Sequence, residues 1–239
     1  MKTSYIYPVK IKTYFNWSSG KDAALALYYL QQESLYNVER LLTSVNMVHD
    51  RVSMHGLRRN LLVPQVAAIG IPGTTIELPE EPSMEEYERG MRYAVEALKR
   101  EKFTCAAFGD IFLEDLRTWR ENQLAPYGIQ TIFPLWRKDT KKLVKEFVRL
   151  GFKAITVCVD ANKLDASFVG RIIDEDFLRE LPRGVDPCGE NGEFHTFCFD
   201  GPIFSKPVAF AKGEKIYREY KGPGNKTSGF WFCDLICNG

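Results

Sequence analysis

The sequence predicts an α/β fold in which a parallel β-sheet with helices on both faces is followed by a smaller mixed α+β domain. In the first 134 residues, short apolar segments alternate with amphipathic segments. This order is typical of a parallel sheet with helical crossovers. After that point the alternation stops, and Gly, Pro and Asp become dense between residues 182 and 207. We therefore expect two domains, at residues 1–134 and 135–239.

Each element of the first domain has a local signal. Clusters of aliphatic and aromatic residues predict strands at 10–17, 40–46, 74–78 and 104–108. Apolar spacing predicts helices at 23–32, at the end of 57–69, at 83–102 and at 113–127. Ser83 is a candidate N-cap, with acidic residues after it and basic residues at the far end of the same helix. Gly70 and Gly128 are expected to end helices.

The second domain has weaker signals. Helices are predicted at residues 140–150 and 168–181. Strands are predicted at 153–160, 193–199, 206–211 and 229–235.

The composition excludes several classes of protein. Hydrophobic residues make up 45% and charged residues 26% of the 239, which argues against a disordered or fibrous chain. The net charge of +1 lacks the basic excess of a nucleic-acid-binding surface. No apolar run approaches the roughly 18 residues of a membrane helix, and the start lacks the apolar core of a signal peptide. We therefore expect a cytoplasmic protein whose six cysteines are reduced and mostly in the core.

The strongest chemical signal is the turn between the first strand and the first helix, Ser18-Ser19-Gly20-Lys21-Asp22. Small residues let the backbone approach a ligand, and the N–H groups of a helix start favour an anion. Lys21 adds a positive charge, so the turn favours phosphate binding; the alternative is an ordinary polar turn. It is not a Walker A loop, because Phe15 and Asp22 replace the required Gly and Ser or Thr. Asp22 is expected in an exposed loop, where its replacement by Ala leaves the fold intact.

A second candidate site is the glycine-rich segment 186–196, DPCGENGEFHT. Its glycines and Asn191 favour a turn that brings backbone close to a substrate. Glu190 and Glu193 flank this turn, and such carboxylates can bind ammonium, accept a proton from attacking ammonia or hold Mg²⁺. The alternative is a hairpin with solvated acids.

Together these segments resemble the N-type ATP pyrophosphatases and, among them, the diphthine–ammonia ligase family, most of all its bacterial branch. Residues 17–23 are similar to the pyrophosphate loop S-G-G-x-D-S, with Ser19 for a Gly and Ala23 for the last Ser. The other similar segments are Gly70-Ile71-Pro72, Gly109-Asp110 with Arg117 and Arg120-Glu121, Phe133-Pro134-Leu135-Trp136, Leu164-Asp165 with Gly170-Arg171, and residues 189–196. The resemblance implies a Rossmann-like fold of the HUP superfamily.

The resemblance also implies a two-step amide synthesis. A substrate carboxylate attacks the α-phosphate of ATP, pyrophosphate leaves, and ammonia attacks the acyl-adenylate. The residues implied for ATP are Trp17, Ser18, Ser19, Gly20, Lys21, Asp22, His55, Gly109 and Asp110. Those implied for the substrate are Gly189, Asn191, Gly192, His195 and Arg120. Catalytic roles are implied for Lys21, Asp22, Glu190 and Glu193, with Asp22 also the ligand of Mg²⁺.

Two other functions stay open. A tRNA-modifying adenylating enzyme of the same superfamily would want paired cysteines and a basic surface, and the sequence has no C-x-x-C and a net charge of +1. A regulatory module that holds ATP without turning it over is favoured by the hydroxyl lost at Ala23. The partners implied are ammonium and a small-molecule or protein-borne carboxylate. Membrane and nucleic-acid partners are not expected, and a homodimer is left open.

Overall fold

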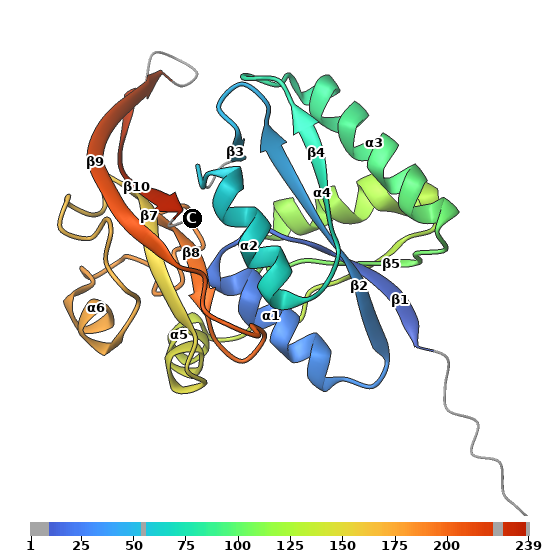
Figure 1. Cartoon of the computed structure of the whole chain (residues 1–239), viewed down its shortest axis with the longest axis horizontal. Coiled ribbons are helices and arrows are strands. Elements are labelled where there is room, and N and C mark those ends of the chain that lie inside the picture. The colour runs from blue at the N-terminus through green and yellow to red at the C-terminus, as the bar shows by residue number, and fades with distance from the viewer. Residues whose placement is uncertain (1–9, 54–55, 222–226, 238–239) are drawn as a thin grey trace, which may run out of the picture.

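Two β-sheets lie side by side in the computed structural model, which describes residues 10–53, 56–221 and 227–237 (Figure 1). The first sheet contains five parallel strands in the order β4 (Gly73–Leu78), β2 (Tyr36–Asn46), β1 (Ile11–Asn16), β5 (Cys105–Ala107) and β6 (Gln130–Ile132). A two-residue strand, β3 (Arg51–Val52), pairs antiparallel with the end of β2. The predicted parallel sheet is confirmed.

Helices cover both faces of this sheet, as the sequence predicts. The helices α1 (Lys21–Gln32) and α2 (Arg59–Ile69) pack on the face turned toward the second sheet. The helices α3 (Met84–Arg100) and α4 (Glu114–Leu124), with the short 3₁₀ helix η1 (Ala125–Tyr127), cover the other face. The carboxyl ends of the strands are therefore the open edge of the sheet, where ligands of such folds bind.

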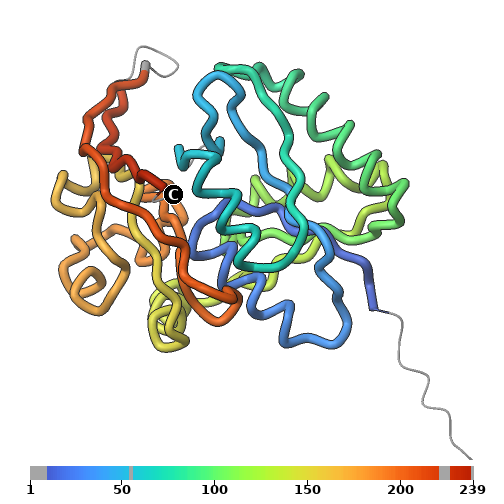
Figure 2. The backbone as a smooth tube through the Cα atoms, viewed as in Figure 1, coloured from blue at the N-terminus to red at the C-terminus, as the bar shows by residue number. Residues whose placement is uncertain are grey.

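The second sheet is antiparallel, in the order β8 (Phe194–Asp200), β7 (Lys153–Asp160), β10 (Thr227–Cys237) and β9 (Phe210–Lys221). The helices α5 (Thr140–Arg149) and α6 (Glu175–Glu180) flank it. Figure 2 shows the orange part of this sheet beside the blue helix α1. One apolar core contains residues of α1, α2, β7 and β8. The predicted division near residue 134 falls between β6 and α5 and stays a prediction.

Local capping signals explain several element ends. The Ser83 hydroxyl accepts a hydrogen bond from the amide of Glu86, whose carboxylate accepts one from the amide of Ser83, so α3 starts with a complete capping box. Gly70 ends α2 in the left-handed conformation with φ 77°. These ends lie where the sequence predicts them.

Other segments differ from the prediction. The helix predicted at 168–181 is reduced to α6, because the preceding chain bonds to β7 instead: the amide of Thr156 donates to Arg171 O and the amide of Gly170 donates to Thr156 O. The strand predicted at 206–211 begins at Phe210 and continues to Lys221. Its outer half is a sheet edge with many exposed polar side chains, so it lacks the apolar alternation of a half-buried strand. The second strand also starts earlier than predicted, at Tyr36.

None of the helices in the described part of the chain is long and apolar enough to cross a membrane. The five cysteines other than Cys237 are buried in the fold, which agrees with their prediction as core residues.

Candidate active site

The turn after β1 is a sharp reversal at the carboxyl edge of the parallel sheet. Ser19 is buried and has a left-handed backbone with φ 71°, and Gly20 is the N-cap of α1. The carbonyl of Ser19 accepts hydrogen bonds from the amide of Cys198 at 2.9 Å and from Gln65 Nε2 at 3.0 Å. We call residues 18–22 the elbow. Its unusual conformation is held by partners from α2 and from the second sheet.

Gln65 is the main residue of this site that sequence reasoning missed. Its side chain is fully buried, and Nε2 also donates to Cys198 O at 2.6 Å. Its Oε1 accepts from Trp17 Nε1 at 2.9 Å. Both amide protons and the amide oxygen are therefore engaged, as a buried amide requires. The signal was a lone glutamine on the buried side of an apolar helical segment.

Lys21 lies differently from what the sequence suggests. Its side chain is turned into the protein, with 3% of its surface exposed, instead of presenting a charge outside the elbow. Its ammonium donates to Asp22 Oδ1 at 2.9 Å, to Asp22 Oδ2 at 2.7 Å and to the carbonyl of Cys188. Burial by itself would lower the pKa of Lys21, but the Asp22 carboxylate outweighs it and the pKa is raised. The ammonium therefore stays charged inside the fold.

Asp22 also differs from its prediction. It lies in the first turn of α1 rather than in an exposed loop, and its side chain is 29% exposed. Because it pairs with a buried ammonium, Asp22→Ala would remove the carboxylate that balances this charge. The expectation that this change leaves the fold intact is therefore replaced by an expected loss of stability.

The acidic turn, residues 186–193, is brought directly against the elbow. Glu193 is 3% exposed, and it accepts hydrogen bonds from the amides of Asp186 and Asn191 and from the Asn191 side chain, at 3.0–3.1 Å. This carboxylate therefore closes the turn that contains it. Gly189 has φ 70°, and a Cβ there would lie 2.9 Å from Phe194 O. Gly192, with φ 84°, is likewise required by the turn itself.

Glu190 reaches from the acidic turn to the loop after β5. One of its oxygens accepts hydrogen bonds from the amides of Ile111 at 2.7 Å and Phe112 at 3.3 Å. Burial raises the pKa of Glu190 to about 7, and the carboxylates of Asp22 and Asp110 act in the same direction. The two predicted glutamates therefore differ: Glu193 is buried within its own turn, whereas Glu190 has a pKa near neutral pH.

The residues after β5 form the third part of the site. Arg120 Nε lies 2.9 Å from Asp110 Oδ2, and the guanidinium lies 4.4 Å from the ring centre of Phe108. Gly109 packs against the start of α1, since a Cβ there would lie 3.0 Å from the amide nitrogen of Ala23. Absence of a side chain at this position lets the β5 loop and the elbow touch.

A cavity opens beside the elbow at the carboxyl ends of β1 and β2. Its lining combines residues from both strands, from β3, β4 and from the helices α3 and α4: Asn16, Trp17, Ser18, Leu42, Thr43, Ser44, Val52, Ser53, Ile76, Tyr87, Met91 and Arg120. Three of these, Trp17, Ser18 and Arg120, are predicted site residues. The hydroxyl groups on the β2 side carry no motif by which sequence reasoning could have found them.

The remaining predicted residues are less closely tied to the cavity. His195 lies on β8 opposite Cys158, and burial together with Lys21 lowers its pKa to about 4, so its ring is neutral at pH 7. Asn191 is exposed at the tip of the acidic turn. His55 lies outside the described residues. In the part of the chain that the structure describes, no three His, Cys, Asp or Glu side chains gather as they would around a metal ion.

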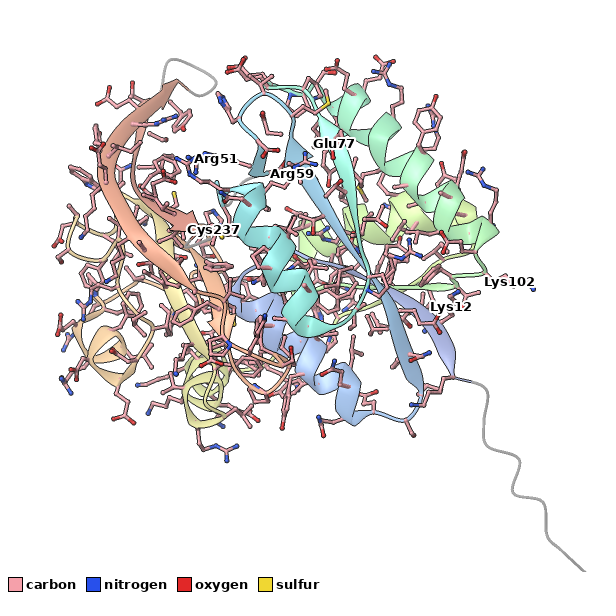
Figure 3. The ribbon with its side chains drawn as sticks, in the orientation of Figure 1. Lys12, Arg51, Arg59, Glu77, Lys102 and Cys237 are labelled. Atoms are coloured by element: carbon pink, nitrogen blue, oxygen red, sulfur yellow. The ribbon has the colours of Figure 1, made fainter. Side chains whose placement is uncertain are left out.

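Ion pairs join the second sheet to the edge of the site. Asp234 on β10 accepts hydrogen bonds from Arg51 Nη1 at 3.0 Å and Arg58 Nε at 3.0 Å. These bonds, first that from Arg58, lower the pKa of Asp234 to about 2. Figure 3 shows Arg51 on the side nearest the second sheet, with Arg59 and Glu77 farther from that sheet. Arg59 pairs in turn with Glu77 of β4.

Comparison with known families identifies the family of this chain. A family model described as the diphthamide synthase N-terminal domain matches residues 11–131. The chain belongs to this family. A second model, the diphthamide synthase C-terminal domain, matches residues 139–226. The resemblance inferred from the elbow and the acidic turn is therefore confirmed, and the elbow lies in the N-terminal and the acidic turn in the C-terminal matched region of this diphthamide synthase homologue.

Curated relatives of this diphthamide synthase homologue carry the name diphthine–ammonia ligase. The protein from Bos taurus is 30% identical over 123 residues, which cover 49% of this chain and 46% of the relative. That from Danio rerio is 34% identical over 113 residues, 45% of this chain and 44% of the relative. That from Schizosaccharomyces pombe is 34% identical over 104 residues, 42% of this chain and 17% of the relative. The matched segments span less than half the length of these relatives.

Proposed function

We propose that this member of the diphthamide synthase family is an ATP-dependent ligase that joins ammonia to a substrate carboxylate. The observation that carries the proposal is the position of the cavity, which reaches Ser18, the first residue of the elbow at the start of α1. A nucleoside in this cavity would have its phosphates beside the N–H groups of the helix start. The names of the curated relatives support the same class of reaction.

In this proposal the elbow holds the phosphates through its backbone. Ser18 is partly exposed and Gly20 is buried, and both residues are small. Their small size would let an anion come close to the backbone N–H groups. The barrier to phosphoryl chemistry is largely electrostatic, because charge builds up as pyrophosphate separates. Gln65 and the amide of Cys198 hold the Ser19 carbonyl, so the elbow would present its remaining backbone N–H groups to the phosphates without reorganising during the reaction.

A magnesium ion would accompany the nucleotide. Asp22 is the carboxylate at the elbow, and Mg²⁺ commonly uses one or two carboxylates together with substrate phosphates. A single protein carboxylate fits this mode, whereas a site made wholly of protein ligands would need more groups than the described residues bring together. When bound, the ion would neutralise charge on the phosphates. Asp22 would hold it while keeping its pairing with Lys21.

Glu190 is proposed as the acid–base group of the second step. A carboxyl whose pKa lies near 7 is well matched to proton transfer at neutral pH. It would accept a proton from the ammonia nitrogen as the new C–N bond forms and the adenylate leaves. We propose that residues 135–239, which carry Glu190, form the substrate-binding domain. Its substrate would be a carboxylate, and its second partner ammonium.

A second candidate is an ATP-holding module without turnover. Two observations favour it: Ala23 lacks the last hydroxyl of the pyrophosphate loop, and the amide of Lys21 is already bonded to the Thr196 hydroxyl. Both reduce the donors available to phosphate. ATP–pyrophosphate exchange in the presence of a carboxylate separates the two, because only the ligase forms an acyl-adenylate.

The first test is nucleotide binding by isothermal titration calorimetry. Ser44→Phe would fill the cavity beside β2 and is expected to weaken ATP binding at least tenfold. Ser167→Phe places the same side chain at an exposed position outside the lining of the cavity and serves as the matched control. Equal ATP affinity in the wild type, Ser44→Phe and Ser167→Phe would refute the assignment of the cavity. Ammonium-dependent release of pyrophosphate with a panel of carboxylates then tests the reaction.

A further inference from the structure

We propose that Lys21 is a positioning residue that locks the acidic turn against the elbow, and that it is not a ligand of the nucleotide phosphates. The inference rests on the proposed function of the same site, but it concerns a role that the geometry assigns separately. Lys21 is the only cationic residue of the elbow, so the direction of its side chain decides whether the elbow offers a positive charge to a phosphate.

The ammonium of Lys21 has no donor left for a phosphate. A lysine ammonium offers three protons. Three acceptors surround this one, namely the two oxygens of Asp22 and the carbonyl of Cys188. The ring of Phe194 covers it as well, with its centre 5.3 Å from Nζ. To reach a phosphate, Lys21 would have to abandon Cys188 or Asp22 and leave a buried polar group unpaired, which is costly.

The hydrogen bond from Lys21 to the carbonyl of Cys188 fixes the acidic turn two residues before Glu190. Cys188 and Glu190 are separated only by Gly189, which has a left-handed backbone. Glu190 in turn accepts hydrogen bonds from the amides of Ile111 and Phe112. One continuous path therefore joins the elbow, the acidic turn and the loop after β5. The bond from Lys21 to Cys188 is the first contact of this path, and the bonds from the amides of Ile111 and Phe112 to Glu190 are the last.

This path explains how a residue of the first strand–helix unit can set the place of a carboxylate 169 positions later. The Lys21 side chain fills a buried space between the elbow and the turn, and its charge is balanced there by Asp22. Removing the ammonium leaves the carbonyl of Cys188 without this donor. The turn would then lose its fixed distance to the elbow, and Glu190 its fixed hold on the amides of residues 111 and 112.

The test compares Lys21→Met with the wild type in three measurements: amide hydrogen exchange, ammonium-dependent turnover and ATP affinity. Met is apolar, similar in length and unable to donate, so it removes the bonds while keeping most of the volume. We expect faster amide hydrogen exchange at Ile111 and Phe112, at least tenfold slower ammonium-dependent turnover, and an ATP dissociation constant within threefold of the wild type. Lys12→Met, at a half-buried lysine on β1, is the matched control and should change none of the three measurements.

Two results would overturn the proposal. One is unchanged exchange at Ile111 and Phe112 in Lys21→Met, and the other is a tenfold or greater loss of ATP affinity. If Lys21→Met fails to fold, the double variant Lys21→Met with Asp22→Asn, which removes both charges of the pair, is compared with Asp22→Asn alone by the same criteria. A wild-type protein that binds no ATP would refute the proposed function instead, while the exchange measurement would still test the role of Lys21.

Discussion

The backbone amide of Lys21 donates a 3.0 Å hydrogen bond to the hydroxyl of Thr196, 175 residues further along the chain. Lys21 begins α1, where the first amides of a helix lack partners within the helix. Thr196 lies on β8 and is 4% exposed. One orphan amide of the elbow is therefore satisfied by the second sheet, so the shape of the proposed phosphate loop depends on residues outside the N-terminal matched region.

Thr196→Val should destabilise the protein by about 1–3 kcal/mol, because it leaves the buried amide of Lys21 without an acceptor. Val keeps the shape of Thr, so little packing is lost. Thr196→Ser keeps the hydroxyl and is the matched control, with a smaller expected loss. Urea denaturation followed by circular dichroism measures both. Equal stability of the two variants would show that this hydrogen bond does not hold the elbow.

Gly109→Ala should weaken ATP binding and stability together. The new Cβ would lie 3.0–3.2 Å from backbone atoms of Asp22 and Ala23, which cannot move without shifting the elbow. Overpacking of this kind costs about 1–3 kcal/mol. The control is Gly73→Ala at the start of β4, whose Cβ would also meet an atom at 3.0 Å, but this atom belongs to the side chain of Val66, which does not line the cavity. Calorimetry that finds the same ATP affinity in both variants would contradict the prediction.

Stability without nucleotide should depend on pH through Glu190. Its pKa in the fold, about 7, lies above its ordinary value of 4.5, so the folded state binds this proton more tightly than the unfolded state. The stabilisation that comes from this bound proton is fully present below pH 4.5 and is lost as the pH rises through 7. Glu190→Gln cannot titrate there. As the pH rises from 5 to 8, the free energy of unfolding of Glu190→Gln should increase relative to that of the wild type by roughly 1–2 kcal/mol. This figure is reduced for partial solvent screening.

Guanidinium denaturation at several pH values checks this dependence. A difference between Glu190→Gln and the wild type that stays constant from pH 5 to 8 would mean that Glu190 does not titrate in this range. Glu121→Gln is a suitable control, since this exposed acid pairs with Arg117 on the surface of α4 and lies outside the acidic turn.

Asp234→Asn should loosen the contact between the second sheet and the start of α2. Because Arg58 and Arg51 lower the pKa of Asp234 to about 2, its stabilising effect is present above the ordinary value of 3.8 and is lost as the pH falls toward 2. We expect a loss of about 1–2 kcal/mol at pH 7 that shrinks below pH 4. Asp176→Asn breaks the exposed pair with Arg179 and should cost less than about 0.5 kcal/mol. Thermal unfolding at pH 7 and pH 3 measures both, and equal losses in the two variants would contradict the prediction.

Local chemistry explains which elements were predictable. The capping box at Ser83 and the left-handed Gly70 act over a few residues, so their positions could be read directly. The edge strand β9 could not be predicted in full, since its pairing with β10 rather than its own apolar pattern makes it a strand. Segment 168–173 was mistaken for helix because its hydrogen bonds go to Thr156, a partner that no local pattern reveals.

The sequence by itself determined most strands and helices, although not β3 or β6, together with the elbow and the acidic turn, because each of these depends on residue types within a short window. Only the tertiary structure decided that Lys21 points inward to Cys188, that Gln65 braces Ser19, and that Glu190 and Glu193 have different surroundings. The physical reason is that burial and charge pairing depend on neighbours far apart in the chain. A lysine is a surface charge or a buried support according to which acceptors the fold brings to it.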